Sequence, residues 1–463
     1  MSGARFAPRS GELATAHELA DLLKRLRPVA ATAVDPLEIA ATLEADGIND
    51  TIAQRLGHPD VFSLAAYLFT KVGRAPVPAP VAGDPWRSRA SHHLFRGALF
   101  GLPGLCYVAA AHALSGIRAL AVVVLSLLLA WTASEFLAYV GYHWIGRRDR
   151  KNAARILQLG FAASVAVIVP VVLLAGWLTG AGSVGTGFAV GQAFYLLAAT
   201  LALTMGAEKW LLGALLPLIA GSAHALLASA EPGAELWRTA AVSVALTTLV
   251  ALIVTTTRRS SAGTLLSRTM IRTGLGQAAF GLVAGALLTF ATLWAVAGPG
   301  GGAAVITVVA LPLSLTMGIA ELMLYRYRRY GFRQLNRSVD LAAFARGARQ
   351  MFAVSMAGYL GVLALSAFGL SLLLRYTGTG SMNVWALATA VVLGGALFAG
   401  LVLRSFGDVR VMLFACAAAL VAEGVLSAAG LGVEPVQLGV CALLCAGLAG
   451  RGVAVLGRAS VHH

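Results

Sequence analysis

Long apolar runs separated by short polar breaks occupy the chain from residue 97 onward and constrain its fold more than any other feature. Over all 463 residues, 58% are hydrophobic and only 12% are charged, whereas a soluble domain carries about 25% charged residues. So few charges cannot cover the surface of a soluble protein of this size. Because an apolar helix of about 20 residues crosses the hydrocarbon core of a bilayer, the sequence predicts an all-α polytopic membrane protein.

Twelve runs have lengths close to those required of a membrane span. The predicted spans are 97–115, 119–145, 155–179, 184–206, 210–230, 238–257, 274–298, 303–325, 350–374, 384–403, 411–430 and 436–457. The second is the longest, and we expect it to tilt or to extend beyond the membrane. An even number of spans places both termini on the same side.

The distribution of basic residues predicts the orientation. Of the 25 lysines and arginines after residue 90, 22 fall at breaks on one side of the twelve-span arrangement, and Arg118, Arg238 and Arg375 fall on the other. Cytoplasmic loops carry such an excess of positive charge. We therefore expect a multi-pass protein of the plasma (cytoplasmic) membrane with both termini in the cytoplasm. The net charge of +15 reflects topology on this interpretation, and no nucleic-acid partner is expected.

Residues 1–90 differ from the rest because their ten basic and ten acidic side chains balance. Helical spacing of apolar residues and the helix-start signal Asp35-Pro36 predict a small helical module. We expect it to dock a cytoplasmic protein or to regulate the membrane part. The predicted organisation is a cytoplasmic helical module (1–74), a Pro-rich linker (75–94), a first six-helix half (95–258), a cytoplasmic connector (259–273) and a second six-helix half (274–463).

The second and eighth predicted spans end in similar sequences. Residues 131–139 read WTASEFLAY and residues 317–325 read MGIAELMLY, so each has small residues before a glutamate and a tyrosine four positions later. That spacing puts the tyrosine one turn further along the same helix face. The match indicates two six-span halves in the same orientation, a parallel repeat found in transporters. Chance similarity between two apolar segments is the alternative.

Acidic side chains within the spans are the strongest functional candidates, because each costs at least about 2.5–3.5 kcal/mol to insert at the centre of a membrane helix. They either line a polar path or fix helix packing as hydrogen-bonded or protonated groups. The set also includes the tyrosines one turn after two of these glutamates and two glutamines near the start or middle of other spans, for which hydrogen bonding between helices is the alternative. The candidate substrate or ion pathway comprises Glu135, Glu321, Glu423, Tyr139, Tyr325, Gln192 and Gln277.

Basic residues at the predicted cytoplasmic ends form a second candidate set, expected to contact anionic membrane lipid or a phosphate group. Its members are Arg147, Arg148, Arg326, Arg328 and Arg329. The four cysteines lie in apolar runs without the histidines or second cysteine pair of a metal site. The chain contains no Walker A loop, His-Glu-x-x-His sequence or Gly-x-Ser-x-Gly sequence. We therefore expect no enzyme activity, no catalytic residues, no metal and no cofactor.

In layout, residues 95–460 resemble the twelve-span polysaccharide flippases of the multidrug/oligosaccharidyl-lipid/polysaccharide exporter group. The similarity lies in the twelve spans, the short external breaks, and the basic loops after spans two and eight. The resemblance implies transport by alternating access. The major facilitator superfamily shares the six-plus-six layout, and the loop Gly146-Arg147-Arg148-Asp149-Arg150-Lys151 has the composition, though not the spacing, of that superfamily's loop.

The leading hypothesis is a flippase-like or exporter-like secondary transporter for a lipid-linked, polysaccharide-type or other amphiphilic substrate. In it, Glu135 and Glu423 bind a coupling proton or cation. Two alternatives remain open. The chain could be a non-transporting membrane scaffold whose residues 1–74 recruit a cytoplasmic polysaccharide-synthesis enzyme, or it could be a major-facilitator-type solute exporter.

Overall fold

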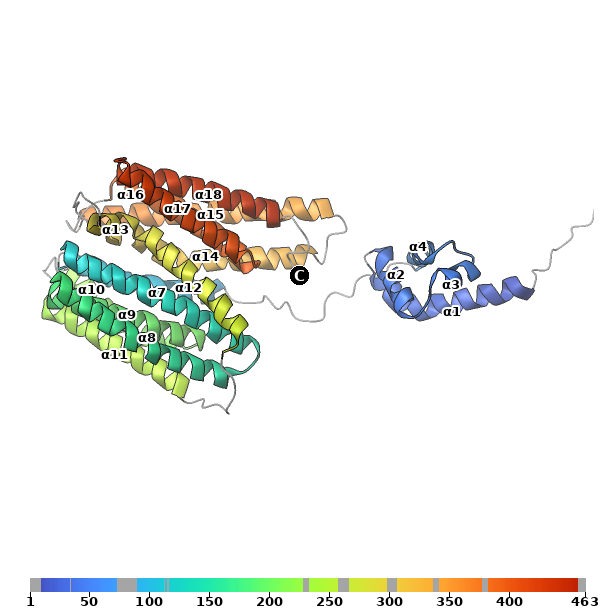
Figure 1. The fold of residues 1–463 in the computed structure, drawn as a ribbon, viewed down its shortest axis with the longest axis horizontal. Coiled ribbons are helices and arrows are strands. Elements are labelled where there is room, and N and C mark those ends of the chain that lie inside the picture. The colour runs from blue at the N-terminus through green and yellow to red at the C-terminus, as the bar shows by residue number, and fades with distance from the viewer. Residues whose placement is uncertain are drawn as a thin grey trace, which may run out of the picture. The chain divides into compact units, whose positions relative to one another are not determined.

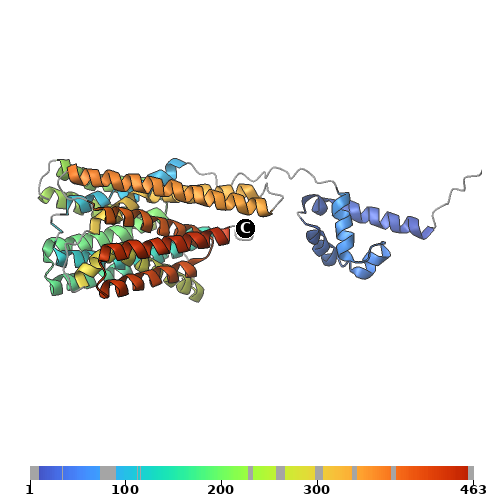
Figure 2. The same ribbon diagram turned by 90° about the horizontal axis from the view of Figure 1, so that it is seen from above.

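The computed structural model describes residues 10–33, 35–72, 90–111, 113–114, 116–227, 233–256, 266–297, 306–335, 341–376 and 382–456. Every regular element in these ranges is an α-helix. The chain divides into two compact units, Met1–Arg87 and Ser88–His463, whose helices appear in Figure 1 and, from a second direction, in Figure 2.

The N-terminal unit contains one long helix and three short ones, and each short helix begins with a side-chain cap. They are α1 (Ser10–Thr32), α2 (Pro36–Ala45), α3 (Asp50–Arg55) and α4 (Val61–Lys71). Asp35 caps α2 by accepting a hydrogen bond from the Leu37 amide, and Asp60 forms a reciprocal capping box with Ser63 at the start of α4. Leu43 and Leu64 are fully buried in one apolar core. This unit is therefore built as a small helical domain with its own core.

The second unit consists of long apolar helices that lie side by side (Figure 2). They are α5 (Ala90–Gly101), α6 (Gly104–Ala109), α7 (Ile117–Gly146), α8 (Arg150–Thr179), α9 (Gly182–Thr204), α10 (Glu208–Leu227), α11 (Ala234–Thr256), α12 (Arg268–Leu288), α13 (Phe290–Ala297), α14 (Ile306–Leu335), α15 (Leu341–Tyr376), α16 (Val384–Ser405), α17 (Val409–Ala428) and α18 (Val433–Leu456). Among the described residues, ten of these helices are long and apolar enough to cross a membrane. The other two predicted spans coincide with the pair α5/α6 and with α14. The all-α polytopic fold is thus confirmed.

Two of the predicted spans are broken, and they are the first span of each half. The first breaks between α5 and α6 at Pro103, which has no backbone N–H for a continuous helix. The seventh breaks between α12 and α13 at Thr289, whose hydroxyl donates to the Gly285 carbonyl at 2.8 Å. Breaks of this kind free backbone polar groups within the membrane, where protein groups must satisfy them.

Helix packing repeats between the halves. α7 packs on α8 as α14 packs on α15, and α8 packs on α9 as α15 packs on α16. α9 packs on α11 as α16 packs on α18, and α10 packs on α11 as α17 packs on α18. These pairings relate the second span to the eighth, which is the correspondence that the similar sequences at 131–139 and 317–325 indicate.

Two seams join the halves, and each consists of a broken helix of one half against a long helix of the other. In the first seam, α5 packs on α14; in the second, α12 packs on α7 (Figure 1). Glycines line the contact: a methyl group on Gly97 of α5 would collide with the backbone of Gly318 on α14. On α12, a methyl group at Gly281 would lie 2.8 Å from Cγ of Glu135, and one at Gly285 would lie 2.8 Å from Cδ2 of Leu128. Small residues let membrane helices approach this closely.

The second seam offers a direct test of this close contact. We expect Gly281→Ala to destabilise the protein by about 1–3 kcal/mol, the usual cost of overpacking a tight contact. Gly276→Ala on the same helix is the control, because a methyl group there meets nothing within 4 Å. Thermal unfolding followed with a thiol-reactive dye measures both, since Cys106, Cys416 and Cys441 are buried. Equal midpoints for the two variants would show that the seam tolerates expansion.

Candidate functional site

The residues singled out from the sequence do not form one site. The structure distributes them over a cavity in the first half, the two seams and a buried position in the second half. Gln192 belongs to the cavity, Glu135 and Glu321 to the seams, and Glu423 to the second half.

The cavity lies between α6, α9, α10 and α11 and has a volume of about 860 Å³. This is within the roughly 300–1,000 Å³ of small-molecule sites. No charged side chain is among its lining residues. Pro217 lies inside α10 beside it, and the next backbone N–H, that of Leu218, donates to Ser243 Oγ of α11 at 2.9 Å. A side chain of α11 thus satisfies a backbone group next to the proline in this wall.

Aromatic rings make up much of the cavity wall. The rings of Tyr107 and Phe188 meet edge to face with centroids 5.0 Å apart, and Trp237 lies 6.4 Å beyond Phe188 in the same geometry. The hydroxyl of Tyr107 donates to Gln192 Oε1 at 2.6 Å, and Gln192 Nε2 donates to the Val123 carbonyl at 3.2 Å. Gln192 therefore holds a tyrosine in the wall, leaving an apolar surface whose ring faces attract cations.

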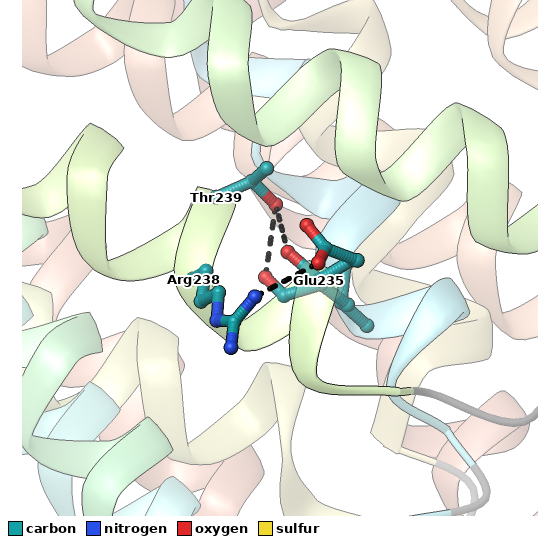
Figure 3. Close-up of polar contacts among 4 residues, drawn as sticks. Glu235, Arg238 and Thr239 are labelled. Atoms are coloured by element: carbon teal, nitrogen blue, oxygen red, sulfur yellow. Dashed lines mark hydrogen bonds and ion pairs between the residues drawn. The ribbon is translucent and has the colours of Figure 1, made fainter.

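Charges at the start of α11 pair with each other outside this cavity. Glu235 and Arg238 form an ion pair at 3.0 Å with both side chains 73% exposed (Figure 3). The Thr239 hydroxyl donates to the backbone carbonyls of Glu235 and Leu236, and Thr239 packs against Gly221 of α10. Arg238, which is expected at an external break, is thus paired with Glu235 and does not line the cavity.

The second seam carries an ion pair between the halves. Arg404 Nη2 of α16 donates to Glu135 Oε2 of α7 at 2.7 Å, with side chains only 26% and 21% exposed. The guanidinium of Arg404 also lies 5.4 Å from the ring centroid of Phe280 on α12. Tyr139, one turn beyond Glu135, lies beside Gly274 of α12. Glu135 is thus part of an inter-half ion pair rather than of the cavity lining.

The first seam has a related arrangement with the charges exchanged between the halves. Arg96 of α5 donates to the Tyr142 hydroxyl at 2.8 Å and interacts electrostatically with Glu321 of α14. Tyr325 lies one turn after Glu321 and is half-buried. Glu135 is thus ion-paired with an arginine of the opposite half, and Glu321 interacts electrostatically with one. The repeated sequence lies where the two halves meet.

Glu423 occupies a different environment on α17. Its side chain is fully buried, Cys441 Sγ of α18 donates to its Oε1 at 3.4 Å, and Oε2 has no partner among the described residues. Gln277, also buried, lies on α12, and its Oε1 likewise has no described partner. The second half thus holds uncompensated polar groups that the first-half cavity does not contact.

The predicted basic set lies at helix ends. Arg147 and Arg148 are exposed after α7, and Arg147 lies 6.0 Å from the ring centroid of Trp144. Arg326 is exposed, whereas Arg329 is half-buried. Arg328 is also half-buried, with its guanidinium 5.7 Å from the ring centroid of Phe406.

Sequence reasoning missed the partners of the predicted acids and most of the cavity wall. Arg96 and Arg404 each lie one residue outside a predicted span. An arginine is expected there from the positive-inside rule and gives no sign of a partner. Tyr107, Phe188 and Trp237 are common aromatic residues of membrane helices, and no local pattern shows that they converge. Among the described residues, no group of three or more His, Cys, Asp or Glu side chains could hold a metal ion.

Comparisons with known proteins give a match in fold only. No family model matches the chain, and no curated protein matches its sequence. It is similar in structure to an inward-facing multidrug resistance MATE family transporter of the MOP superfamily, with a TM-score of 0.49 and 15% identity over 79% of this chain and 94% of that chain. A MATE mutant matches with a TM-score of 0.48 and 14% identity over 81% and 97%.

A double-mutant cycle tests the inter-half ion pair. We expect Glu135→Gln and Arg404→Gln each to lower thermal stability, and the double variant to lose less than their sum, with a coupling of about 1–3 kcal/mol. The matched control is Glu235→Gln with Arg238→Gln, because that exposed pair lies within one helix and should couple by less than about 0.5 kcal/mol. Additive effects at Glu135 and Arg404 would show that the contact does not join the halves.

Proposed function

We propose that this chain is a secondary exporter that moves an amphiphilic substrate across the membrane by alternating access. The two equivalent seams carry the proposal. Each combines a broken, glycine-faced helix with an electrostatic interaction between a glutamate of one half and an arginine of the other, which is a 2.7 Å ion pair at Glu135 and Arg404. At glycine faces the helix backbones touch without interdigitated side chains, so the two bundles can change their angle there. The charge interactions then favour one arrangement of the bundles over the other.

The glutamates and arginines of the two seams would hold the cytoplasmic side of the protein closed. On the predicted topology, Glu135, Arg404, Arg96 and Glu321 all lie in the cytoplasmic halves of their helices. The cavity is lined by the outer half of α9 and by most of the length of α11. The described arrangement would then be the state closed to the cytoplasm. Opening separates half-buried opposite charges, which is strongly unfavourable unless water or substrate compensates them.

The composition of the cavity supports a neutral or cationic amphiphile as substrate. A lipid-linked sugar carries a phosphate or pyrophosphate, which proteins bind with arginine or lysine. The cavity lining contains neither. Its aromatic rings instead suit a flat apolar body, and their faces favour a delocalised positive charge. Among the amphiphiles expected from the sequence, the cavity thus favours a lipophilic cation over a polysaccharide precursor.

Transport of ethidium, a flat lipophilic cation, tests this function. We expect purified protein in liposomes that contain DNA to accumulate ethidium when a pH gradient is imposed. Trp237→Ala removes a ring from the cavity wall and should raise the half-saturating concentration about tenfold, equivalent to about 1.4 kcal/mol. The control is Trp177→Ala, because that tryptophan on α8 is 78% exposed and lies outside the lining.

The same assay separates the exporter from the alternatives. Equal effects of Trp237→Ala and Trp177→Ala would remove the cavity from the transport path. Deleting residues 1–87, which form a separate compact unit, should leave ethidium transport in place if that unit binds a regulatory protein. A scaffold protein would give no transport with or without this unit under any gradient. The major-facilitator alternative predicts transport of a polar solute that does not depend on Trp237.

We further propose that anionic membrane lipid binds where the α7–α8 connection meets the start of α12. Met270 of α12 packs there with Val140 and Ile156. Exposed cations lie close in sequence to these three residues, and none is ion-paired with an acid of the described residues; they are Arg147, Arg148, Lys151, Arg155, Arg268 and Arg272. Each basic side chain near an anionic leaflet contributes about 1 kcal/mol of attraction.

Thermal unfolding in detergent tests the lipid site. Added phosphatidylglycerol should raise the midpoint of the wild type more than phosphatidylcholine does, because it neutralises the clustered cations. We expect the double variant Arg147→Gln/Arg148→Gln to lose at least half of that difference. The control double variant, Arg118→Gln/Arg238→Gln, removes the same charge from the opposite predicted side. An equal loss in both would indicate a response to net charge rather than to this site.

A further inference from the structure

The buried carboxyl of Glu423 is the strongest unexplained feature of the second half. It has an exposure of 0%. Among the described residues, the Cys441 thiol is its one hydrogen-bond donor, at 3.4 Å from Oε1, and Oε2 has no partner. One turn further along α17, the hydroxyl of Ser427 is also buried and without a described partner. Unsatisfied polar groups in such a place are costly and indicate a missing ligand or proton.

Among the described residues, no charged group is paired with Glu423. α17 packs against α12, α13, α16 and α18, and α13 has no titratable side chain. Of the titratable groups on these helices, Cys441 is the one that interacts with Glu423. Arg404 is paired with Glu135 and Arg451 with Asp408. The remaining titratable side chains are Arg410 and Cys416 on α17, Glu434 and Cys445 on α18, and Arg268 and Arg272 at the start of α12.

The surroundings fit a proton better than a metal cation. Hard cations take about six or more oxygen ligands, whereas the carboxyl here meets a thiol. An ionised carboxylate without a cation would be strongly disfavoured in this apolar setting. The neutral acid needs one acceptor for its O–H, and after losing its proton it would require water or a rearrangement of the helices around it.

The position of Glu423 connects it to the broken helix of the second seam. Gln437 lies one turn before Cys441 on α18, and its Nε2 donates to the Leu287 carbonyl at 3.2 Å. Leu287 is next to the last residue of α12, directly before the break at Thr289. α12 packs on α17 on one side and on α7 of the first half on the other. A change in the packing of α17 and α18 therefore reaches the helix that joins the halves.

We infer that Glu423 is the binding site for a coupling proton, and that the protonated side chain stabilises the packed arrangement of α12, α17 and α18. Release of the proton would admit water between these helices and loosen the α12 break. The coupling role rests on the proposed export function, whereas proton binding by Glu423 stands independently of it. The proton is taken up and released without any other covalent change.

Infrared spectroscopy of the purified protein tests the site without transport. We expect a deuterium-sensitive carbonyl band of a buried protonated carboxylic acid in the wild type at neutral pH. Glu423→Gln should remove it, and Cys441→Ala should shift it because the thiol donor is lost. Glu434→Gln is the control, since Glu434 is exposed and bonded to Asn383. Absence of the band in the wild type, or its survival in Glu423→Gln, would overturn the inference.

Ethidium transport with imposed gradients then tests the coupling. We expect Glu423→Gln to reduce accumulation driven by a pH gradient at least tenfold while retaining downhill exchange of ethidium, and Glu434→Gln to behave like the wild type. Unchanged pH-driven accumulation in Glu423→Gln would contradict coupling at this site. Sodium-driven transport that Glu423→Gln abolishes, without an acid band in the wild type, would instead identify a sodium site. If the wild type transports nothing but shows the band, the proton site stands and the export proposal fails.

Discussion

A charged or polar side chain inside a bilayer must find a partner in the protein, because hydrocarbon offers none. This constraint explains the polar chemistry of the membrane unit. Glu135 is paired with Arg404 from the other half, and Glu235 is paired with Arg238 outside the cavity. The backbone N–H after Pro217 and a backbone carbonyl at the end of α12 receive side-chain partners from α11 and α18. Neutral groups such as Gln277 Oε1 and Ser427 Oγ also have no described partner, but Glu423 is the buried acid among them, and for a group that can ionise such a departure indicates function.

The repeat of the two halves determines where these polar partners lie. Each half contributes a broken helix with glycines on one face and a long helix with a glutamate, and each broken helix packs on the long helix of the other half. Close approach at glycines brings the backbone of one half against the glutamate of the other, as Gly281 shows at Glu135. An arginine from the opposite half then pairs with Glu135, and another interacts electrostatically with Glu321. Close glycine packing and charge interactions thus occur together at both seams.

The sequence predicted the fold well because apolar length and charge placement are local properties. The second span, predicted at 119–145, is observed as Ile117–Gly146. The breaks in the first and seventh spans were not predicted, since hydropathy does not register a single Pro103 or a turn at Thr289. The site was predicted only in part, because an acid within a span is visible in the sequence while its partner is not. Arg404 lies 269 residues from Glu135, and no local pattern connects them.

The two acids that the sequence ranked together have opposite environments, and the difference bears on how an exporter of this design would work. Glu135 already has a cation, so protonation would weaken its contact with Arg404 and release one half from the other. Glu423 has no cation, so protonation would favour the packed helices around it. A proton therefore opposes closure at one acid and supports packing at the other. Because α12 touches Glu135 through Gly281 and packs on α17, this single broken helix would receive both effects.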